Sequence, residues 1–306
     1  MDLDALNAAF ARPDVLRFVE GRGGLIWIEI DNGLARATLT THGAQVLSYR
    51  PAGARDDLLF VSECATYGPE QEIKGGVPIC WPWFGRDPAI PERQIHGFAR
   101  LREWSVLACE TRPDGATWVR FGLADDAATH ALWPHYFNLW VEVTVGATLT
   151  VTLTTRNAGD EPFAITQGLH AYFKIGDPAQ LQVHGLDGCR YLDKATDAPA
   201  DAVGVQSGAL VVAAEVNRIY EGVPPRLVID DAALNRRIQL DSQHSRTCVV
   251  WNPWRAGAQA LPDLDVEDYR RFVCVETVNA ASEVIWIAPQ QAAQIGAEYR
   301  IVALES

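Results

Sequence analysis

Apolar and polar residues alternate in short runs along most of the chain. In the clearest run, TLTVTLTT at 148–155, aliphatic residues share one face and threonines fill the other. A period of two is typical of an antiparallel strand with one buried face. The preceding run, LWVEVTV at 139–145, alternates in the same way. The two runs are therefore predicted to form a hairpin around the Gly-Ala pair between them.

The rest of the chain has the same texture. Turn residues separate seven further alternating runs, at 25–30, 34–40, 44–50, 117–123, 226–230, 236–241 and 271–276. Helical periodicity is limited to three short stretches, at 2–10, 125–132 and 265–270. The Ala- and Asp-rich stretch 194–209 is the best candidate for a long loop. Many short strands and few helices predict an all-β fold, a large antiparallel β-sandwich with a few short helices, in which residues 1–306 form one domain.

Composition and charge mainly exclude classes of binding partner and of cellular location. The chain has 306 residues, of which 48% are apolar and 21% charged, enough for a substantial core. Its formal net charge of -13 repels phosphate backbones, so we expect no nucleic-acid partner. The acidic N-terminus does not fit a signal peptide, and no apolar run reaches the roughly 18 residues of a membrane span. We expect a cytoplasmic monomer with no membrane partner.

Cysteine spacing and known motifs exclude further classes. The six cysteines are scattered, without CxxC or a metal-like spacing, and are predicted to be reduced core residues. The sequence contains no GxGxxG after a strand, no GxxxxGK[ST], no HExxH and no GxSxG. The hypotheses of an NAD-binding protein, an ATP-binding protein, a catalytic zinc enzyme or a serine hydrolase therefore lose most of their support.

Two residues are candidates for acid–base chemistry. His170 follows apolar residues in the strand-like QGLHAYFKIG, where a histidine is either a satisfied core residue or a general acid or base. Glu276 ends the run RFVCVE, on the strand face that it shares with Phe272 and Cys274. A carboxylate buried there is costly without a partner. Glu276 is therefore ion-paired, lines a cleft, or lies beyond the buried end of its strand.

The stretch KGGVPICWPWFG, at 74–85, concentrates aromatic bulk between glycines and prolines. These aromatic residues either shape a cleft or belong to the core. From Lys74 to Arg102 there are five basic and two acidic residues, within a strongly acidic chain. Because arginine forks and lysines bind phosphate, this window is either an anion site or ordinary solvated charge, and acidic residues flank it on both sides.

Six motifs together carry a family resemblance. KGGVPICWPWFG, IHGFAR, QGLHAYF, YLDK, WNPW and FVCVE occur in the order seen in glucose-6-phosphate 1-epimerases. These are hexose-6-phosphate mutarotases of the galactose-mutarotase-like, or aldose 1-epimerase, superfamily, and the resemblance spans roughly residues 20 to 300. It implies a β-supersandwich with an open sugar cleft, and it implies no cofactor and no metal.

The resemblance also implies roles by motif position. His170 matches the general acid and Glu276 the general base of pyranose ring opening. Substrate contacts are implied for His96, Arg100 and Asp193. We add Lys74, which together with Arg100 is expected to hold the 6-phosphate, and Gln94 and Trp83 as further candidates. Lys74 stands where the family often has arginine, which keeps the charge but loses the bidentate fork. Gln94 lies one residue out of register with the family's QHGFAR, so its role is the least supported.

The predicted function is interconversion of the α and β anomers of a hexose 6-phosphate, most simply glucose 6-phosphate. Three alternatives stay open. The same reaction could act on unphosphorylated aldoses, against which Lys74 and Arg100 argue. A non-catalytic carbohydrate-binding protein needs neither His170 nor Glu276. A glycoside hydrolase needs two carboxylates about 5 to 9.5 Å apart, for which Asp193 and Glu276 are the available pair.

Overall fold

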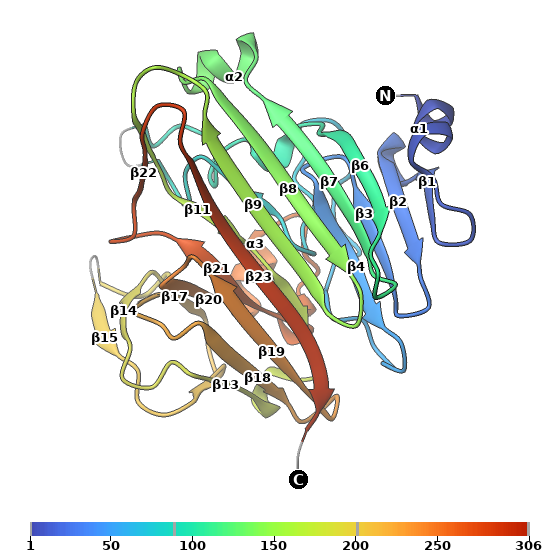
Figure 1. Cartoon of the computed structure of the whole chain (residues 1–306). Helices are drawn as coiled ribbons and strands as arrows, with labels where there is room; N and C mark the ends of the chain where they lie inside the picture. Colours follow the sequence, from blue (N-terminus) through green and yellow to red (C-terminus); the bar gives the residue numbers. More distant parts are fainter. Residues whose placement is uncertain (1, 88–89, 200–201, 305–306) are drawn as a thin grey trace.

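Two large antiparallel sheets form the body of the protein (Figure 1). The computed structural model describes residues 2–87, 90–199 and 202–304. In these ranges the larger sheet has nine strands. In spatial order they are β16 (Leu210–Val211), β13 (Leu181–His184), β18 (Arg226–Asp231), β19 (Arg236–Gln243), β23 (Ala292–Ala303), β9 (Leu149–Asn157), β8 (Phe137–Val145), β7 (Thr117–Ala124) and β6 (Ser105–Thr111).

The second large sheet has eight strands within the described ranges. Its order is β15 (Val203–Val205), β14 (Arg190–Asp193), β17 (Val216–Glu221), β20 (Thr247–Asn252), β21 (Phe272–Asn279), β11 (Gln167–Leu169) and β5 (Ile79–Cys80), with β12 (Tyr172–Lys174) also paired to β21. The strand β21 therefore pairs with three others. This central position makes it the frame of the site described below.

Smaller elements complete the fold. A four-stranded sheet contains β1 (Leu16–Glu20), β2 (Ile26–Asp31), β3 (Ala35–Thr40) and β4 (Gln45–Pro51), and a two-stranded one contains β10 (Phe163–Ile165) and β22 (Ile285–Ile287). The described helices are α1 (Leu3–Phe10), α2 (Ala127–Leu132) and α3 (Trp254–Ala260), with single 3₁₀ turns at Arg22–Gly24, Ala99–Leu101, Pro178–Gln180 and Asp268–Arg270. None of these helices has the length and apolar character needed to cross a bilayer.

The predicted all-β fold is confirmed, and most predicted strands lie within one or two residues of observed ones. The hairpin of β8 and β9 forms as expected, with Val145 opposite Leu149. Three local predictions differ. The helix α3 was missed, the predicted helix at 265–270 is only a 3₁₀ turn, and the predicted loop 194–209 contains β15. Residues 200–201 of that loop lie outside the described residues.

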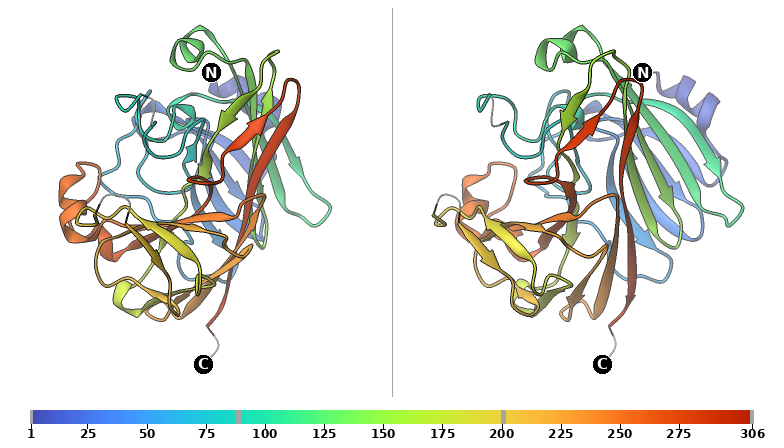
Figure 2. Two further views of the ribbon diagram at one scale, coloured as in Figure 1. Left: turned by 90° about the vertical axis from the view of Figure 1, so that its left-hand side faces the viewer. Right: turned by 60° about the vertical axis from the view of Figure 1, so that its left-hand side comes forward.

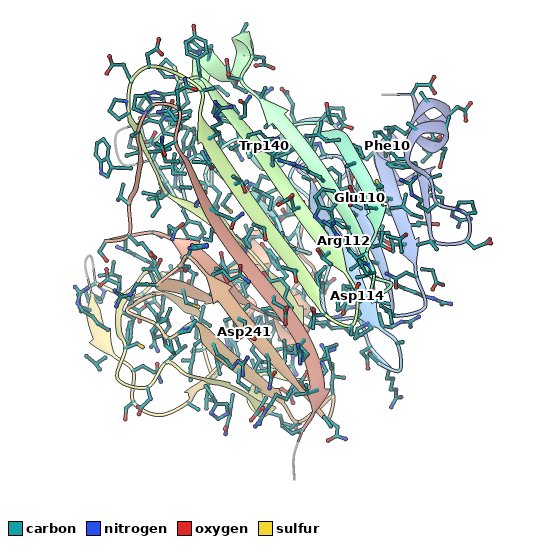
Figure 3. All side chains as sticks on the ribbon, in the orientation of Figure 1. Phe10, Glu110, Arg112, Asp114, Trp140 and Asp241 are labelled. Carbon is teal, nitrogen blue, oxygen red and sulfur yellow. The ribbon has the colours of Figure 1, made fainter. Side chains whose placement is uncertain are left out.

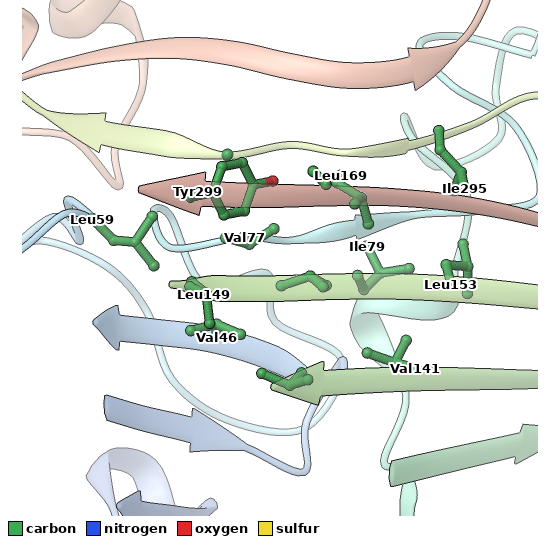
Figure 4. Packing of buried hydrophobic residues seen from close by; sticks show 14 of the residues in the cluster. Val46, Leu59, Val77, Ile79, Val141, Leu149, Leu153, Leu169, Ile295 and Tyr299 are labelled. Atoms are coloured by element: carbon green, nitrogen blue, oxygen red, sulfur yellow. The ribbon is translucent and has the colours of Figure 1, made fainter. Parts of the chain in front are cut away.

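The core lies between the inner faces of the large sheets (Figure 4). Leu149 and Leu153 of β9 and Ile295 of β23 lie on one side, and Ile79 of β5 and Leu169 of β11 lie on the other. All five side chains are completely buried. Burial of each aliphatic side chain stabilises the fold by about 1.5–3 kcal/mol.

The other face of the nine-stranded sheet points toward solvent (Figure 3). Every second residue of β8 is partly exposed, among them Trp140, and the guanidinium of Arg120 lies 5.3 Å from its ring centroid. In contrast, the loops between β5 and β6 and the helix α3 lie on the far side of the molecule (Figure 2). They cover the outer face of the eight-stranded sheet, and the candidate site is formed there.

Candidate active site

Strand register brings His170 and Glu276 together. Leu169 pairs with Thr277, and Tyr172 pairs with Cys274. The two residues between these pairs therefore lie beside Val275 and Glu276, and His170 comes next to Glu276. Their side chains leave the sheet on the same face, with 3.4 Å between His170 Nδ1 and Glu276 Oε2. Glu276 is therefore buried beside a titratable partner and does not lie beyond the buried end of its strand.

This pair is almost completely buried, with residue exposures of 7% for His170 and 1% for Glu276. The facing atoms, Nδ1 and Oε2, have no hydrogen-bond partner among the described residues. Burial, together with the charges of Arg100 and Lys74, lowers the pKa of His170 to about 3. Burial also raises the pKa of Glu276 well above its ordinary value. Burial therefore favours the neutral form of each of the two side chains.

His96 lies beside this pair on the loop that follows β5. Its ring centroid is 5.3 Å from that of His170, and its Nδ1 accepts a hydrogen bond of 3.1 Å from the Gly85 N–H. Burial and the charge of Arg100 lower the pKa of His96 well below its ordinary value. A neutral ring whose Nδ1 accepts carries its proton on Nε2. His96 is therefore a hydrogen-bond donor rather than an acid.

Aromatic rings surround the pair. Tyr172 stacks on His170 at 4.8 Å between centroids, and Trp251 meets the same imidazole edge-on at 6.0 Å. Phe84 contacts His96 edge-on at 4.7 Å. Trp251 and Phe84 are only partly buried, so their rings are available to an incoming ligand. Rings of this kind pack well against the apolar faces of a pyranose.

The two cations of the predicted phosphate site lie close together, and carboxylates already compensate their charge. Lys74 Nζ lies 2.6 Å from Glu72 Oε1 and 3.3 Å from Asp263 Oδ2, while Arg100 lies 2.5 Å from Glu72 Oε2. Burial opposes the charge of Glu72, but Arg100 and Lys74 outweigh it and lower its pKa. Two cations therefore face two carboxylates, and the expected excess of positive charge does not exist at this point. Sequence reasoning noticed Glu72 only as a flanking acid and missed Asp263.

The aromatic stretch divides between core and loop support. Trp81 is fully buried and packs against Phe98, Trp133 and Phe137. Trp83 is 8% exposed, and its indole N–H donates to the carbonyl oxygen of Gln94 at 2.8 Å. Gln94 itself is exposed. Trp83 and Gln94 thus hold the loop that carries His96, and their contact with a sugar stays a prediction.

Asp193 lies away from His170 and Glu276. Register aligns Asp193 with Arg218, Val250 and Val275 across four strands. Val275 points to the face opposite Glu276, and three strand spacings of about 4.8 Å place Asp193 about 14 Å from β21. Its carboxylate accepts from Arg218 at 3.1 Å and from the Ala195 N–H. Substrate contact by Asp193 stays a prediction that this register does not support.

A third side chain joins His170 and Glu276, and sequence reasoning missed it. Cys274 leaves β21 on the same face, and one ligand atom from each of the three residues lies within 4.8 Å of the others. Widely separated cysteines gave no metal-like spacing in the sequence. Strand alternation did, however, place Cys274 on the face of Glu276. Imidazole, thiolate and carboxylate together make a donor set that zinc accepts.

Comparisons with known proteins show the family of this chain. Residues 27–300 match the aldose 1-epimerase family. Two curated relatives carry the provisional name glucose-6-phosphate 1-epimerase. The relative from Salmonella typhimurium is 36% identical over 268 residues, covering 87% of this chain and 85% of the relative. The one from Escherichia coli is 34% identical over 275 residues, covering 90% of each.

Solved structures give the same result. The crystal structure of YeaD from Salmonella typhimurium, provisionally described as a mutarotase, has a TM-score of 0.88 at 31% identity and covers 98% of this chain and 99% of its own. Slr1438 from Synechocystis has a TM-score of 0.77 at 20% identity, covers 94% of this chain and 98% of its own, and shares the fold. The resemblance predicted from six motifs is confirmed. The chain belongs to the aldose 1-epimerase family.

Proposed function

We propose that this protein interconverts the α and β anomers of a hexose 6-phosphate, with glucose 6-phosphate as the preferred candidate. The observation that carries the proposal is the buried pair of His170 and Glu276, 3.4 Å apart on one face of β21 and its neighbour. The names of the relatives from Salmonella typhimurium and Escherichia coli support the phosphorylated substrate. A cytoplasmic location and a monomeric state stay predictions.

The pair can carry out the reaction with one proton. In ring opening, ionised Glu276 takes the proton of the anomeric hydroxyl O1, the C1–O5 bond breaks, and protonated His170 gives its proton to O5. The product is the open-chain aldehyde, with neutral His170 and protonated Glu276. After rotation about C1–C2 the steps reverse on the other face of C1. Each positioned acid or base contributes about 10²- to 10⁴-fold.

Burial favours the protonation state that accompanies the open chain. Neutral His170 and protonated Glu276 are the forms that burial stabilises in the free protein. The open-chain sugar is the high-energy species of mutarotation, so a site tuned to its protonation state lowers the barrier to ring opening. His96, as a neutral donor, is placed to hold a sugar oxygen beside His170.

The phosphate is assigned to Lys74 and Arg100. Both cations are buried next to the pair, and both already bind Glu72. A phosphate with a charge of about -1.5 to -2 outcompetes one carboxylate for two donors. On this proposal Glu72 moves aside when the sugar phosphate enters.

Exchange spectroscopy tests the proposal directly. Two-dimensional NMR exchange between the α and β anomeric protons is measured on glucose 6-phosphate and on glucose. We expect acceleration on the phosphate, and a loss of about 10²- to 10⁴-fold in His170→Asn and in Glu276→Gln. His184→Asn and Glu142→Gln, on the nine-stranded sheet, serve as matched controls. Full activity in either site variant refutes the assignment of the pair.

One observation favours a second candidate function. The cations of the predicted phosphate site are neutralised by Glu72 and Asp263, as expected for a site that binds an uncharged aldose. Equal acceleration of glucose and glucose 6-phosphate in the same experiment establishes that function instead. No acceleration of either sugar leaves a carbohydrate-binding protein. The glycosidase alternative loses support, because Asp193 and Glu276 lie on opposite faces of their sheet.

A further inference from the structure

We propose that His170, Cys274 and Glu276 form a binding site for one Zn²⁺ ion. Their register explains why the three residues meet. Cys274 and Glu276 are two apart on β21, and His170 follows β11, which pairs with that strand. All three side chains leave the same face of the eight-stranded sheet and are buried. The strand frame therefore brings the three donors close together before any ion arrives.

The spacing of the donors fits a metal better than a hydrogen bond. His170 Nδ1 and Glu276 Oε2 are 3.4 Å apart, which is beyond the usual hydrogen-bond range of about 2.7–3.2 Å. Two ligand atoms on a tetrahedral zinc, each about 2.1 Å from it, lie about 3.4 Å apart. Neither atom has another partner among the described residues. The ligand atom of Cys274 lies within 4.8 Å of both, so a small side-chain rotation completes a three-point site.

The donor types and charges select the ion. Calcium and magnesium bind oxygen ligands, whereas one thiolate, one imidazole and one carboxylate suit zinc. A thiolate and a carboxylate also cancel the double charge of the ion, so the complex adds no net charge to a buried place. Binding releases the thiol proton, and also the carboxyl proton where Glu276 holds one. Three protein ligands leave the fourth position of a tetrahedral zinc to water.

Binding at this site opposes proton transfer. A zinc ion that occupies His170 Nδ1 and Glu276 Oε2 fixes both side chains and holds them in their deprotonated forms. Zinc is then an inhibitor that competes with the sugar. This consequence rests on the proposed function, whereas binding itself does not. Measurements of binding and of activity therefore separate the two ideas.

The binding experiment uses the full chain, freed of metal with a chelator. Zn²⁺ is titrated against a chromophoric indicator, and Cd²⁺ is added in parallel to record the ultraviolet absorption of a cadmium–thiolate bond. We expect one ion per chain and a thiolate band in the wild type. In Cys274→Ala the zinc affinity falls by more than about 100-fold, because even the loss of a residue that only hydrogen-bonds to a metal ligand costs about 10- to 100-fold. Cys248→Ala is the matched control, since this buried cysteine on β20 pairs with Thr277 and faces the other side of the sheet.

Several results overturn the proposal. Unchanged zinc affinity in Cys274→Ala, or the absence of a thiolate band in the wild type, excludes Cys274 as a ligand. If Cys274→Ala does not fold, Cys274→Ser replaces it. The cadmium–thiolate band is measured on the wild type, so this test of the thiolate ligand does not depend on any variant. In the activity arm, zinc slows wild-type exchange, a chelator restores it, and Cys274→Ala stays insensitive. Equal zinc inhibition in wild type and Cys274→Ala also contradicts the site.

Discussion

Glu72 offers the sharpest test of how this site treats a phosphate. Its two carboxylate oxygens bind Lys74 Nζ at 2.6 Å and Arg100 at 2.5 Å, so the side chain occupies the space between the two cations. Glu72→Gln keeps the size and shape of the side chain and removes its charge. The cluster with Lys74, Arg100 and Asp263 then changes from neutral to a net charge of +1.

The size of the effect follows from the bonds that Glu72 holds. A net charge-assisted hydrogen bond stabilises by about 1.5–3 kcal/mol. If displacing Glu72 costs the equivalent of one such bond, its removal tightens phosphate binding by about 10- to 150-fold. Breaking a fully buried ion pair costs about 3–5 kcal/mol. We expect a smaller decrease in the free energy of unfolding for Glu72→Gln, because the side chain of Glu72 is 24% exposed.

Two assays check this expectation. The KM for glucose 6-phosphate, from anomer exchange, and the Kd for inorganic phosphate, from calorimetry, both fall in Glu72→Gln, while the KM for glucose stays the same. Glu70→Gln is the control, because Glu70 is 78% exposed and lies 3.9 Å from its partner Arg102. A folded Glu72→Gln protein with equal or weaker phosphate affinity refutes the reasoning. Glu72 would then orient the two cations instead of competing with the ligand.

Three further predictions concern the frame of the site and the stability of the fold. In Gly97→Ala the new Cβ meets the Trp81 carbonyl oxygen at 1.9 Å, so we expect a large drop in Tm and, because His96 is the neighbouring residue, a loss of activity. Gly85→Ala has a similar positive φ but open space around the new Cβ, and its free energy of unfolding falls by only about 1–2 kcal/mol. Trp81→Ala empties a fully buried site and lowers the free energy of unfolding by about 3–5 kcal/mol in urea titrations, with the half-buried Trp140→Ala as the milder comparison. Hydrogen bonds from Arg237 hold the pKa of Asp230 below its ordinary 3.8. Ionised Asp230 therefore stabilises the fold above that pH, and this stabilisation disappears as pH falls through the folded-state pKa. Asp230→Asn therefore lowers stability at pH 7 by up to about 1 kcal/mol, and the difference from wild type shrinks in urea titrations near pH 3; an unchanged difference contradicts the linkage.

The fold was predictable because its signal is local. In a strand with one buried face, apolar and polar residues alternate in the sequence, as in β8 and β9, and the turn between these two strands is short. The helix α3 lacked such a signal, since its sequence WRAGAQA has small residues in place of an apolar stripe. The strand β15 was missed for a similar reason, because a three-residue edge strand depends on pairing with β14 and not on its own pattern.

His170 and Glu276, the proposed acid and base, were predictable as two separate residues but not as neighbours. Each motif pointed to one side chain, and alternation placed Glu276 on the face of Cys274. Only the register of β21 against β11 and β12 decides that His170 lies next to Glu276, and register depends on contacts between segments about a hundred residues apart in the chain. The same long-range pairing turned Asp193 away from Glu276, although its motif suggested a shared site.

Charge is the property that the sequence described least well. The window from Lys74 to Arg102 contains more basic than acidic residues, yet carboxylates match the two cations of the site in number. Glu72 lies just outside the window in sequence, and Asp263 lies on a loop far along the chain; both contact these cations. Local charge counts miss such pairing whenever the partner is far away in sequence. On the proposed function, a phosphate must therefore compete with Glu72 for Lys74 and Arg100, and the strength of that competition depends on the geometry of Glu72 rather than on the number of basic residues.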